Sequence, residues 1–136
     1  MLFKGNKFSD HRGIITYNNE FDVSAIKRIY TIENSSLEFI RGWQGHKVEQ
    51  RWFAAMSGRF KVSIICVDDF ENPSPDLEIH NYELTTDGLT VLHIPAGHIT
   101  AIQALEHGSK MLVMADYGIG ELKDEYRYEL DYFIRK

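Results

Sequence analysis

One segment of the chain combines a proton acceptor, an amide and several cations at strand-like spacing. It reads Arg41-Gly42-Trp43-Gln44-Gly45-His46-Lys47-Val48-Glu49-Gln50-Arg51-Trp52-Phe53. Period-two alternation would place Gln44 and His46 on one face of a strand, while Gly42 and Gly45 leave space for a ligand. Histidine titrates near neutral pH, so it can take a proton from a bound molecule. The segment predicts a ligand site where a proton can be transferred.

Two further segments carry candidate polar residues. In Asp10-His11-Arg12-Gly13, the guanidinium of Arg12 could bind a phosphate or a carboxylate through two hydrogen bonds. The stretch from 92 to 100 holds His93 and His98. Each feature also fits an ordinary structural role, a polar turn for the first and satisfied strand histidines for the second. Neither segment by itself defines a function.

Charge is distributed unevenly along the chain. The 136 residues include 15 Lys and Arg against 20 Asp and Glu, for a net charge of −5. Residues 41–61 hold five cations and one acid, whereas residues 67–87 hold seven acids and no cation. The acidic balance excludes a typical nucleic-acid binder, because phosphate neutralisation supplies most of such affinity. A small anionic ligand suits the basic segment, although a solvated hairpin beside an ordinary basic strand face also explains the pattern.

Most of the chain has the pattern of short strands. β-Branched and aromatic runs separated by turn signals predict strands at 13–17, 25–33, 60–67, 77–84, 89–94 and 111–115. Their spacing of about 8–12 residues is typical of a β-sandwich or barrel. One helical stripe, formed by Leu122, Tyr126, Leu130 and Phe133, predicts a short C-terminal helix that packs on the sheets. With no repeat or linker, residues 1–136 are expected to form one domain.

The apolar runs and the cysteine content also indicate the cellular compartment of the protein. Apolar runs such as residues 53–56 are too short for a membrane span, and residues 1–7 lack the apolar stretch of a signal peptide. The single cysteine, Cys66, has no partner for an internal disulfide. These features predict a cytoplasmic protein without a membrane association.

The segments 41–53 and 92–100 resemble the paired motifs of the cupin superfamily, whose fold is a double-stranded β-helix, or jelly-roll barrel. Metal-binding cupins carry His-x-His and a glutamate in the first motif and Pro-x-Gly-x-x-His in the second. Here the first reads Gln44-Gly45-His46 with Glu49 displaced, and the second ends at Thr100. An amide and a hydroxyl are poor ligands for zinc, iron or copper, so we predict no metal and no cofactor. A metal-dependent cupin using His46, His93 or His98 is the alternative.

The order of motifs is similar to that of metal-free cupins that isomerise nucleotide-linked sugars, the WxcM-like proteins. These include the dTDP-4-keto-6-deoxy-sugar 3,4-ketoisomerases and 3,5-epimerases. The matching stretches are 10–13, Ile26-Lys27-Arg28-Ile29-Tyr30, 41–47, Ser57-Gly58, Ile94-Pro95-Ala96-Gly97 and Ala115-Asp116-Tyr117. The ketoisomerases are the more similar branch, since they have Lys-Arg-(Val/Ile)-Tyr followed by Arg-Gly-x-His-Ala-His-Lys.

The resemblance implies an enolate mechanism on a dTDP-linked 4-keto sugar. It places Arg12 and Arg41 on the diphosphate, Tyr30 and Gln44 at the sugar, Arg51 at the enolate and Tyr117 as the acid. The family's first motif histidine is replaced by Gln44, which cannot accept a proton near neutral pH. His46 matches the second histidine of the ketoisomerase motif and is the matched base that remains.

Two expectations accompany this interpretation. The first is that Gln44 marks either a base relocated to His46 or a catalytically inactive cupin that still binds the nucleotide sugar. The second, implied by the resemblance, is a homodimer in which an amino-terminal strand crosses to the partner.

Overall fold

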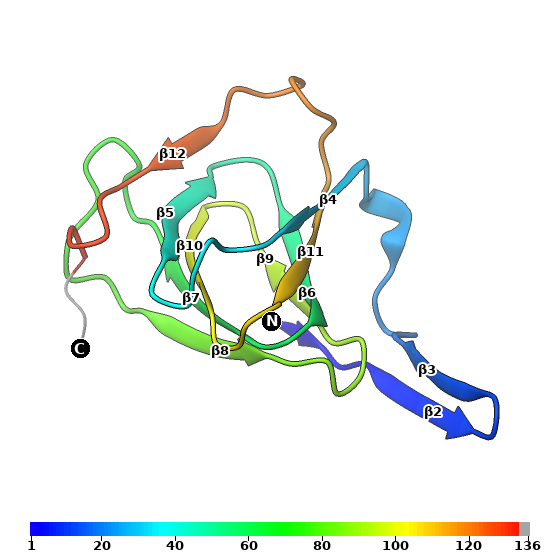
Figure 1. The fold of residues 1–136 in the computed structure, drawn as a ribbon. Helices are drawn as coiled ribbons and strands as arrows, with labels where there is room; N and C mark the ends of the chain where they lie inside the picture. The colour runs from blue at the N-terminus through cyan, green and yellow to red at the C-terminus, as the bar shows by residue number, and fades with distance from the viewer. Residues whose placement is uncertain (134–136) are drawn as a thin grey trace.

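The computed structural model describes residues 1–133, and its regular secondary structure is almost entirely strand (Figure 1). The strands are β1 (Leu2–Phe3), β2 (Asn6–Asp10), β3 (Gly13–Tyr17), β4 (Arg28–Ile32), β5 (Ile40–His46), β6 (Arg51–Ser57), β7 (Phe60–Cys66), β8 (His80–Leu84), β9 (Val91–Ile94), β10 (His98–Ala104), β11 (Lys110–Ala115) and β12 (Glu125–Arg127). One 3-10 turn is found in the described part of the chain, η1 (Val23–Ala25), and it precedes β4. Within residues 1–133, no helix has the length and apolar character needed to cross a membrane.

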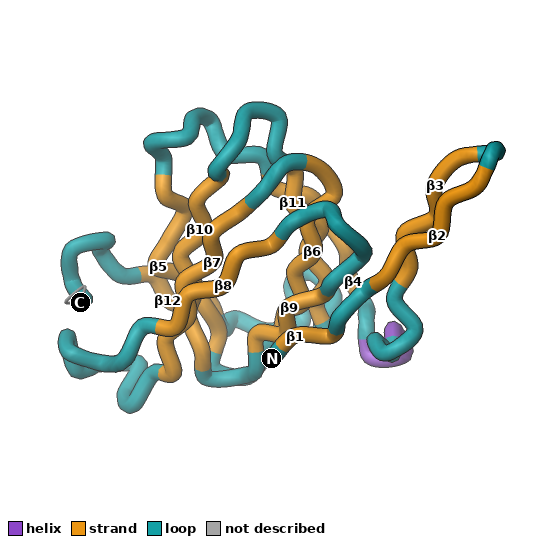
Figure 2. The backbone as a smooth tube through the Cα atoms, turned by 90° about the horizontal axis from the view of Figure 1, so that it is seen from below, coloured by secondary structure: helices purple, strands orange, loops and turns teal. Residues whose placement is uncertain are grey.

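Two five-stranded antiparallel sheets face each other and close into a barrel (Figures 1 and 2). Their strand orders are β1-β9-β6-β11-β4 and β12-β5-β10-β7-β8. Alternation along the strands directs one set of apolar side chains between the sheets, including Phe53, Phe60, Leu92 and Val113. This arrangement confirms the all-β cupin fold predicted from the sequence.

Both outer faces of the barrel are covered by chain segments. Trp52 and Ala54, on the outer side of β6, pack with Phe3, Phe21 and neighbouring residues of the amino-terminal part. On the other sheet, the outer side of β5 and its neighbours is covered by residues near the C-terminus, where the ring centroids of Trp43 and Phe133 lie 5.6 Å apart. These covers explain why β6 and β7 are buried on both faces.

The prediction of a short C-terminal helix is wrong. Residues 125–127 instead form β12, which extends the second sheet by pairing with the edge strand β5, so that Tyr126 lies opposite Gly45. Beyond it, Trp43 and Tyr128 exchange two backbone hydrogen bonds. Leu122 and Leu130 are exposed, so the apparent helical stripe is not a buried face. Pairing with β5 satisfies backbone groups that a helix would have left open at the sheet edge.

The hairpin of β2 and β3 projects away from the barrel (Figures 1 and 2). Its apolar side chains are unusual for a solvated ribbon, with Phe8 53%, Ile14 69% and Ile15 59% exposed. Arg12 lies in its turn and forms an ion pair with Asp10 at 2.8 Å. The predicted strand at 13–17 is therefore present, but it contributes nothing to the barrel core.

Candidate active site

A cavity of about 370 Å³ opens between the two sheets. Its polar wall comes from four strands and one loop, with Tyr30 on β4, Arg41, Gln44 and His46 on β5, Glu49 before β6, Arg51 on β6, and His98 and Thr100 on β10. Apolar residues such as Phe53, Ile94 and Ile102 close the inner end. A concave, half-apolar space with converging polar groups is the common form of a small-ligand site.

His46 is buried at the end of β5, with 8% of its surface exposed. Its Nδ1 lies 3.1 Å from the main-chain oxygen of Asp124 and 3.3 Å from Oε2 of Glu49. Burial, followed by the positive charge of Arg51, lowers the pKa of His46, while the negative charges of Glu49 and Asp124 oppose that shift. The imidazole is thus neutral near physiological pH.

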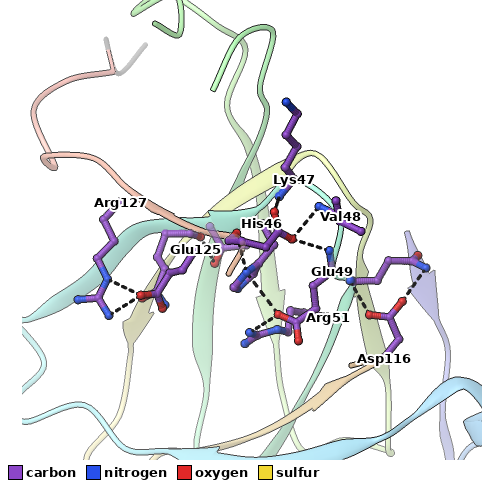
Figure 3. Close-up of polar contacts among 12 residues, drawn as sticks. His46, Lys47, Val48, Glu49, Arg51, Asp116, Glu125 and Arg127 are labelled. Carbon is purple, nitrogen blue, oxygen red and sulfur yellow. Dashed lines mark hydrogen bonds and ion pairs between the residues drawn. The ribbon is translucent and has the colours of Figure 1, made fainter. Parts of the chain in front are cut away.

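Glu49, Arg51 and Tyr30 form a connected polar group beside that ring (Figure 3 shows the first two). Nη2 of Arg51 donates to Oε2 of Glu49 at 2.7 Å, and Nη1 of Arg51 donates to the hydroxyl of Tyr30. A guanidinium has five N–H donors, so these two bonds leave others available for an oxygen in the cavity. Arg51 is therefore a cation that can stabilise a developing oxyanion.

Asp124 fixes the turn that carries Glu49. Its Oδ1 accepts the backbone N–H of Lys47 at 3.0 Å, and its Oδ2 accepts those of Val48 and Glu49, each at 2.8 Å (Figure 3). A carboxylate that accepts three backbone bonds restrains the loop between β5 and β6. This restraint holds Glu49 between His46 and Arg51.

The amide of Gln44 is oriented by the strand that replaced the expected helix. Its Nε2 donates to Oε1 of Glu125 at 2.5 Å, and the other carboxylate oxygen of Glu125 forms an ion pair with Arg127 at 3.2 Å. Because the amide nitrogen faces a carboxylate, its carbonyl oxygen remains an acceptor for a ligand hydroxyl. Gln44 can bind a substrate here but cannot remove its proton.

A second cavity, of about 420 Å³, adjoins the first. His46, Glu49 and Arg51 line both spaces, and Arg28, Lys123 and the 118–125 loop complete the second. The histidine and its two charged neighbours therefore stand at the junction of two cavities. Groups bound in either one can reach them.

The structure brings together five of the seven site residues predicted from the sequence: Tyr30, Arg41, Gln44, His46 and Arg51. Arg12 lies in the projecting hairpin and lines neither cavity, and Tyr117 is also outside both linings. Nζ of Lys27 lies 6.0 Å from the centroid of the Tyr117 ring. Sequence reasoning did not assign roles to Glu49, Asp124 or Glu125. The period-two spacing of Glu49 and Arg51 could have linked that pair, whereas nothing local marked Asp124.

The remaining histidines of interest differ in position. His98 pairs with His46 across β10 and β5 and lines the first cavity. His93 lies in the other sheet, where its Nε2 bonds Oε1 of Gln50 at 2.7 Å and its ring stacks on Trp52 at 5.0 Å. Burial is the main cause that lowers the pKa of His93. Within residues 1–133, no group of three or more His, Cys, Asp or Glu side chains could hold a metal ion.

Two five-stranded antiparallel sheets that close around a polar cavity form the architecture of the cupin fold. A family model matches residues 2–136, nearly the whole chain. The chain belongs to the FdtA family, described as WxcM-like, C-terminal. It matches none of the curated proteins with which it was compared.

Solved structures with the same fold include sugar-nucleotide enzymes. One is QdtA, a 3,4-ketoisomerase from Thermoanaerobacterium thermosaccharolyticum, solved as a histidine-to-asparagine mutant with TDP-4-keto-6-deoxyglucose. Its sequence is 22% identical to this chain, and the two folds superpose with a TM-score of 0.73 over 97% of this chain and 89% of QdtA. The WlaRB TDP-quinovose 3,4-ketoisomerase from Campylobacter jejuni is 19% identical with a TM-score of 0.69, covering 97% and 95%. A dTDP-4-dehydrorhamnose 3,5-epimerase from Bacillus anthracis, solved with TDP and PPi, is 15% identical with a TM-score of 0.68, covering 96% and 74%.

Proposed function

We propose that this protein isomerises or epimerises a dTDP-linked 4-keto-6-deoxy sugar through an enolate. The observation that carries the proposal is a buried neutral histidine, His46, in the same cavity as Arg51 and Tyr30. Family membership and the sugar-nucleotide ligands of similarly folded enzymes support this class of substrate.

The proposed chemistry begins with the proton on C3, which the adjacent C4 ketone makes acidic. His46 takes that proton, the C–H bonding pair forms a C3–C4 double bond, and the carbonyl oxygen becomes an enolate stabilised by Arg51. Return of a proton to C3 from the opposite side gives the epimer. Loss of the O3 proton, with protonation of C4 and O4, gives the 3-keto isomer.

Tyr30 is the hydroxyl best placed to exchange a proton with the enolate oxygen. It lines the cavity and is bound to Arg51, whereas Tyr117, the acid implied by the resemblance, lies outside the lining. Replacing Tyr30 with phenylalanine is therefore expected to lower turnover more than the same replacement at Tyr117.

Arg41 is proposed to bind the diphosphate at the open side of the cavity, since a guanidinium can form two hydrogen bonds with phosphate oxygens. Arg12 would reach a cavity from the projecting hairpin of a second copy, with the protein acting as a homodimer. The exposed apolar side chains of that hairpin support this arrangement.

One observation favours a second function. Gln44 stands where the family's first histidine is expected, and Glu125 holds it in place as a binding group. The alternative is therefore a cupin that binds the nucleotide sugar without chemistry.

Turnover and binding measured together separate the two functions. Under the catalytic proposal, His46→Ala lowers product formation by about 10²-fold or more and leaves TDP affinity nearly unchanged, because one assisted proton transfer is worth about 10²–10⁴-fold. Arg41→Ala is expected to weaken TDP binding, measured by calorimetry, under both the catalytic and the binding-only function. A wild-type protein that binds TDP and the keto sugar, yet forms no product, would replace the catalytic proposal with the binding one.

A further inference from the structure

We propose that Glu49 is a positioning residue that fixes which nitrogen of His46 accepts the proton and stabilises the imidazolium that results. The inference deepens the proposed function and rests on it, because it assigns Glu49 to the same proton transfer. It is carried by one buried oxygen, Oε2 of Glu49, that contacts both His46 and Arg51.

The contacts of the ring select one tautomer. Nδ1 of His46 faces two oxygens, the main-chain oxygen of Asp124 at 3.1 Å and Oε2 of Glu49 at 3.3 Å. A proton on Nδ1 can be donated to the Asp124 oxygen and is attracted by the nearby Glu49 carboxylate, whereas a lone pair there would face two negative oxygens. The proton therefore lies on Nδ1. The other ring nitrogen, Nε2, has no hydrogen-bond partner among residues 1–133 and is left as the acceptor.

The negative charge of Glu49 gives it a second role, which is to stabilise the protonated form of His46. When His46 takes a proton it becomes a cation close to Arg51, in a site where both are nearly excluded from water. Like charges in a poorly solvated site repel strongly. Glu49 is only 7% exposed and contacts both cations through one oxygen, so it offsets this repulsion at the moment of proton transfer.

Other charged groups around the ring are already engaged or distant from it. Asp124 uses both carboxylate oxygens on three backbone N–H groups, and Glu125, opposite His46 on β12, is bound by Gln44 and Arg127. Lys47 adjoins His46 in the chain and is exposed, and His98 pairs with it from β10. Among the described side chains, Glu49 is the carboxylate in contact with the imidazole.

Glu49 also explains how Arg51 is tolerated within the barrel wall. A buried ion is costly unless it is paired and hydrogen-bonded, and the 2.7 Å contact with Glu49 supplies that pairing. Asp124 restrains the turn between β5 and β6, and this turn holds the Glu49 carboxylate between His46 and Arg51. The arrangement joins the proposed base and the proposed enolate-stabilising cation in one unit.

The first test measures the wild-type protein without substrate. ¹⁵N NMR of protein labelled on histidine, with the His46 signals assigned by their loss in His46→Ala, reports which ring nitrogen carries the proton. The proposal predicts that neutral His46 is protonated on Nδ1. A neutral ring protonated on Nε2 would overturn it.

Titration of the same signals tests the charge. Glu49→Gln, which keeps the size of the side chain, is expected to move the midpoint of His46 to lower pH, and Arg51→Met is expected to move it higher. Glu125→Gln is the matched control and should leave the midpoint in place, because that carboxylate does not contact the ring. Equal midpoints in wild type and Glu49→Gln would contradict the proposal.

Kinetics then separate positioning from a merely structural role. Glu49→Gln is expected to lower kcat at least about 10-fold with little change in KM, and Glu49→Asp should recover part of the loss. A rise in KM with unchanged kcat would contradict the assignment. If the wild-type protein shows the predicted tautomer and titration but no turnover, the proposed function fails while the role of Glu49 toward His46 stands.

Discussion

At the scale of single residues, the missing first-motif histidine is the feature that most shapes the function. Gln44 is tied to Glu125 and presents an acceptor, while His46 retains a ring nitrogen without a partner in residues 1–133. Under the proposed function, binding and proton transfer are therefore divided between Gln44 and His46, two residues apart on β5. If the base is His46, a residue that orients the His46 ring is also needed, and the Glu49 carboxylate contacts that ring.

The pH dependence of activity follows from the state of His46. The ring must be neutral to accept a proton, and burial together with Arg51 lowers its pKa below the usual 6.5. Activity should therefore persist as pH falls through 6.5 and decline only as it passes the lowered pKa. The pH profile of kcat/KM for the keto sugar checks this. If activity fell on the acid side with a midpoint above pH 6.5, and if this fall remained after His46 was replaced, the assignment of His46 as base would be contradicted.

At the scale of elements, the close pairing of β5 and β10 holds the site in register. Gly45 lies opposite Ile99, and a Cβ at Gly45 would stand 2.2 Å from the main-chain oxygen of His98 and 2.6 Å from Cα of Ile99. Backbone this close leaves no space for a methyl group. The strand that carries Gln44 and His46 thus depends on a glycine between them.

Gly45→Ala is expected to lower the free energy of unfolding by about 1–3 kcal/mol, the usual cost of overpacking. Urea unfolding midpoints measure the change. Gly118→Ala is the matched control, since its added Cβ would meet only the flexible end of Glu121, and it should shift the midpoint little. Equal stability of both variants would show that β5 can move away from β10 without loss.

Local pattern predicted the strands well because their residues alternate and are bounded by turns. The predicted stretches 13–17, 60–67 and 111–115 match β3, β7 and β11 to within a residue at each end. The C-terminal stripe failed because i, i+4 spacing also arises by chance, and pairing with β5 decided the structure of 125–127. Contacts between distant segments, such as Asp124 with residues 47–49, leave no periodic signal, so that part of the site could not be predicted.

At the scale of the whole molecule, the barrel is well covered but the hairpin is not. Phe8 and Ile15 lie opposite each other on the ribbon, and both are exposed. Figure 2 shows this hairpin projecting away from the barrel, and Arg12 at its turn lines neither cavity of its own chain. In the proposed homodimer, a second copy would bury the apolar ribbon, and Arg12 would reach the diphosphate bound to that copy.

We predict that light scattering at micromolar concentration gives twice the 15.8 kDa chain mass. The double substitution Ile14→Glu and Ile15→Glu should yield a monomer with weaker TDP binding, because charges on the ribbon oppose its burial. Met56→Glu, at another exposed apolar residue on β6, serves as the control and should remain dimeric. A wild-type chain that is monomeric at this concentration would refute the hairpin exchange.

The proposed function assigns to His46 the removal of the proton on C3 of a nucleotide-linked 4-keto sugar. The most direct measurement places the wild-type protein in heavy water with dTDP-4-keto-6-deoxyglucose and follows deuterium at C3, C4 and C5 by NMR. We predict incorporation that is lost in His46→Ala, at C3 if the reaction is an epimerisation and at C4 if it is a ketoisomerisation. Bound sugar nucleotide without deuterium at either C3 or C4 would contradict the role of His46.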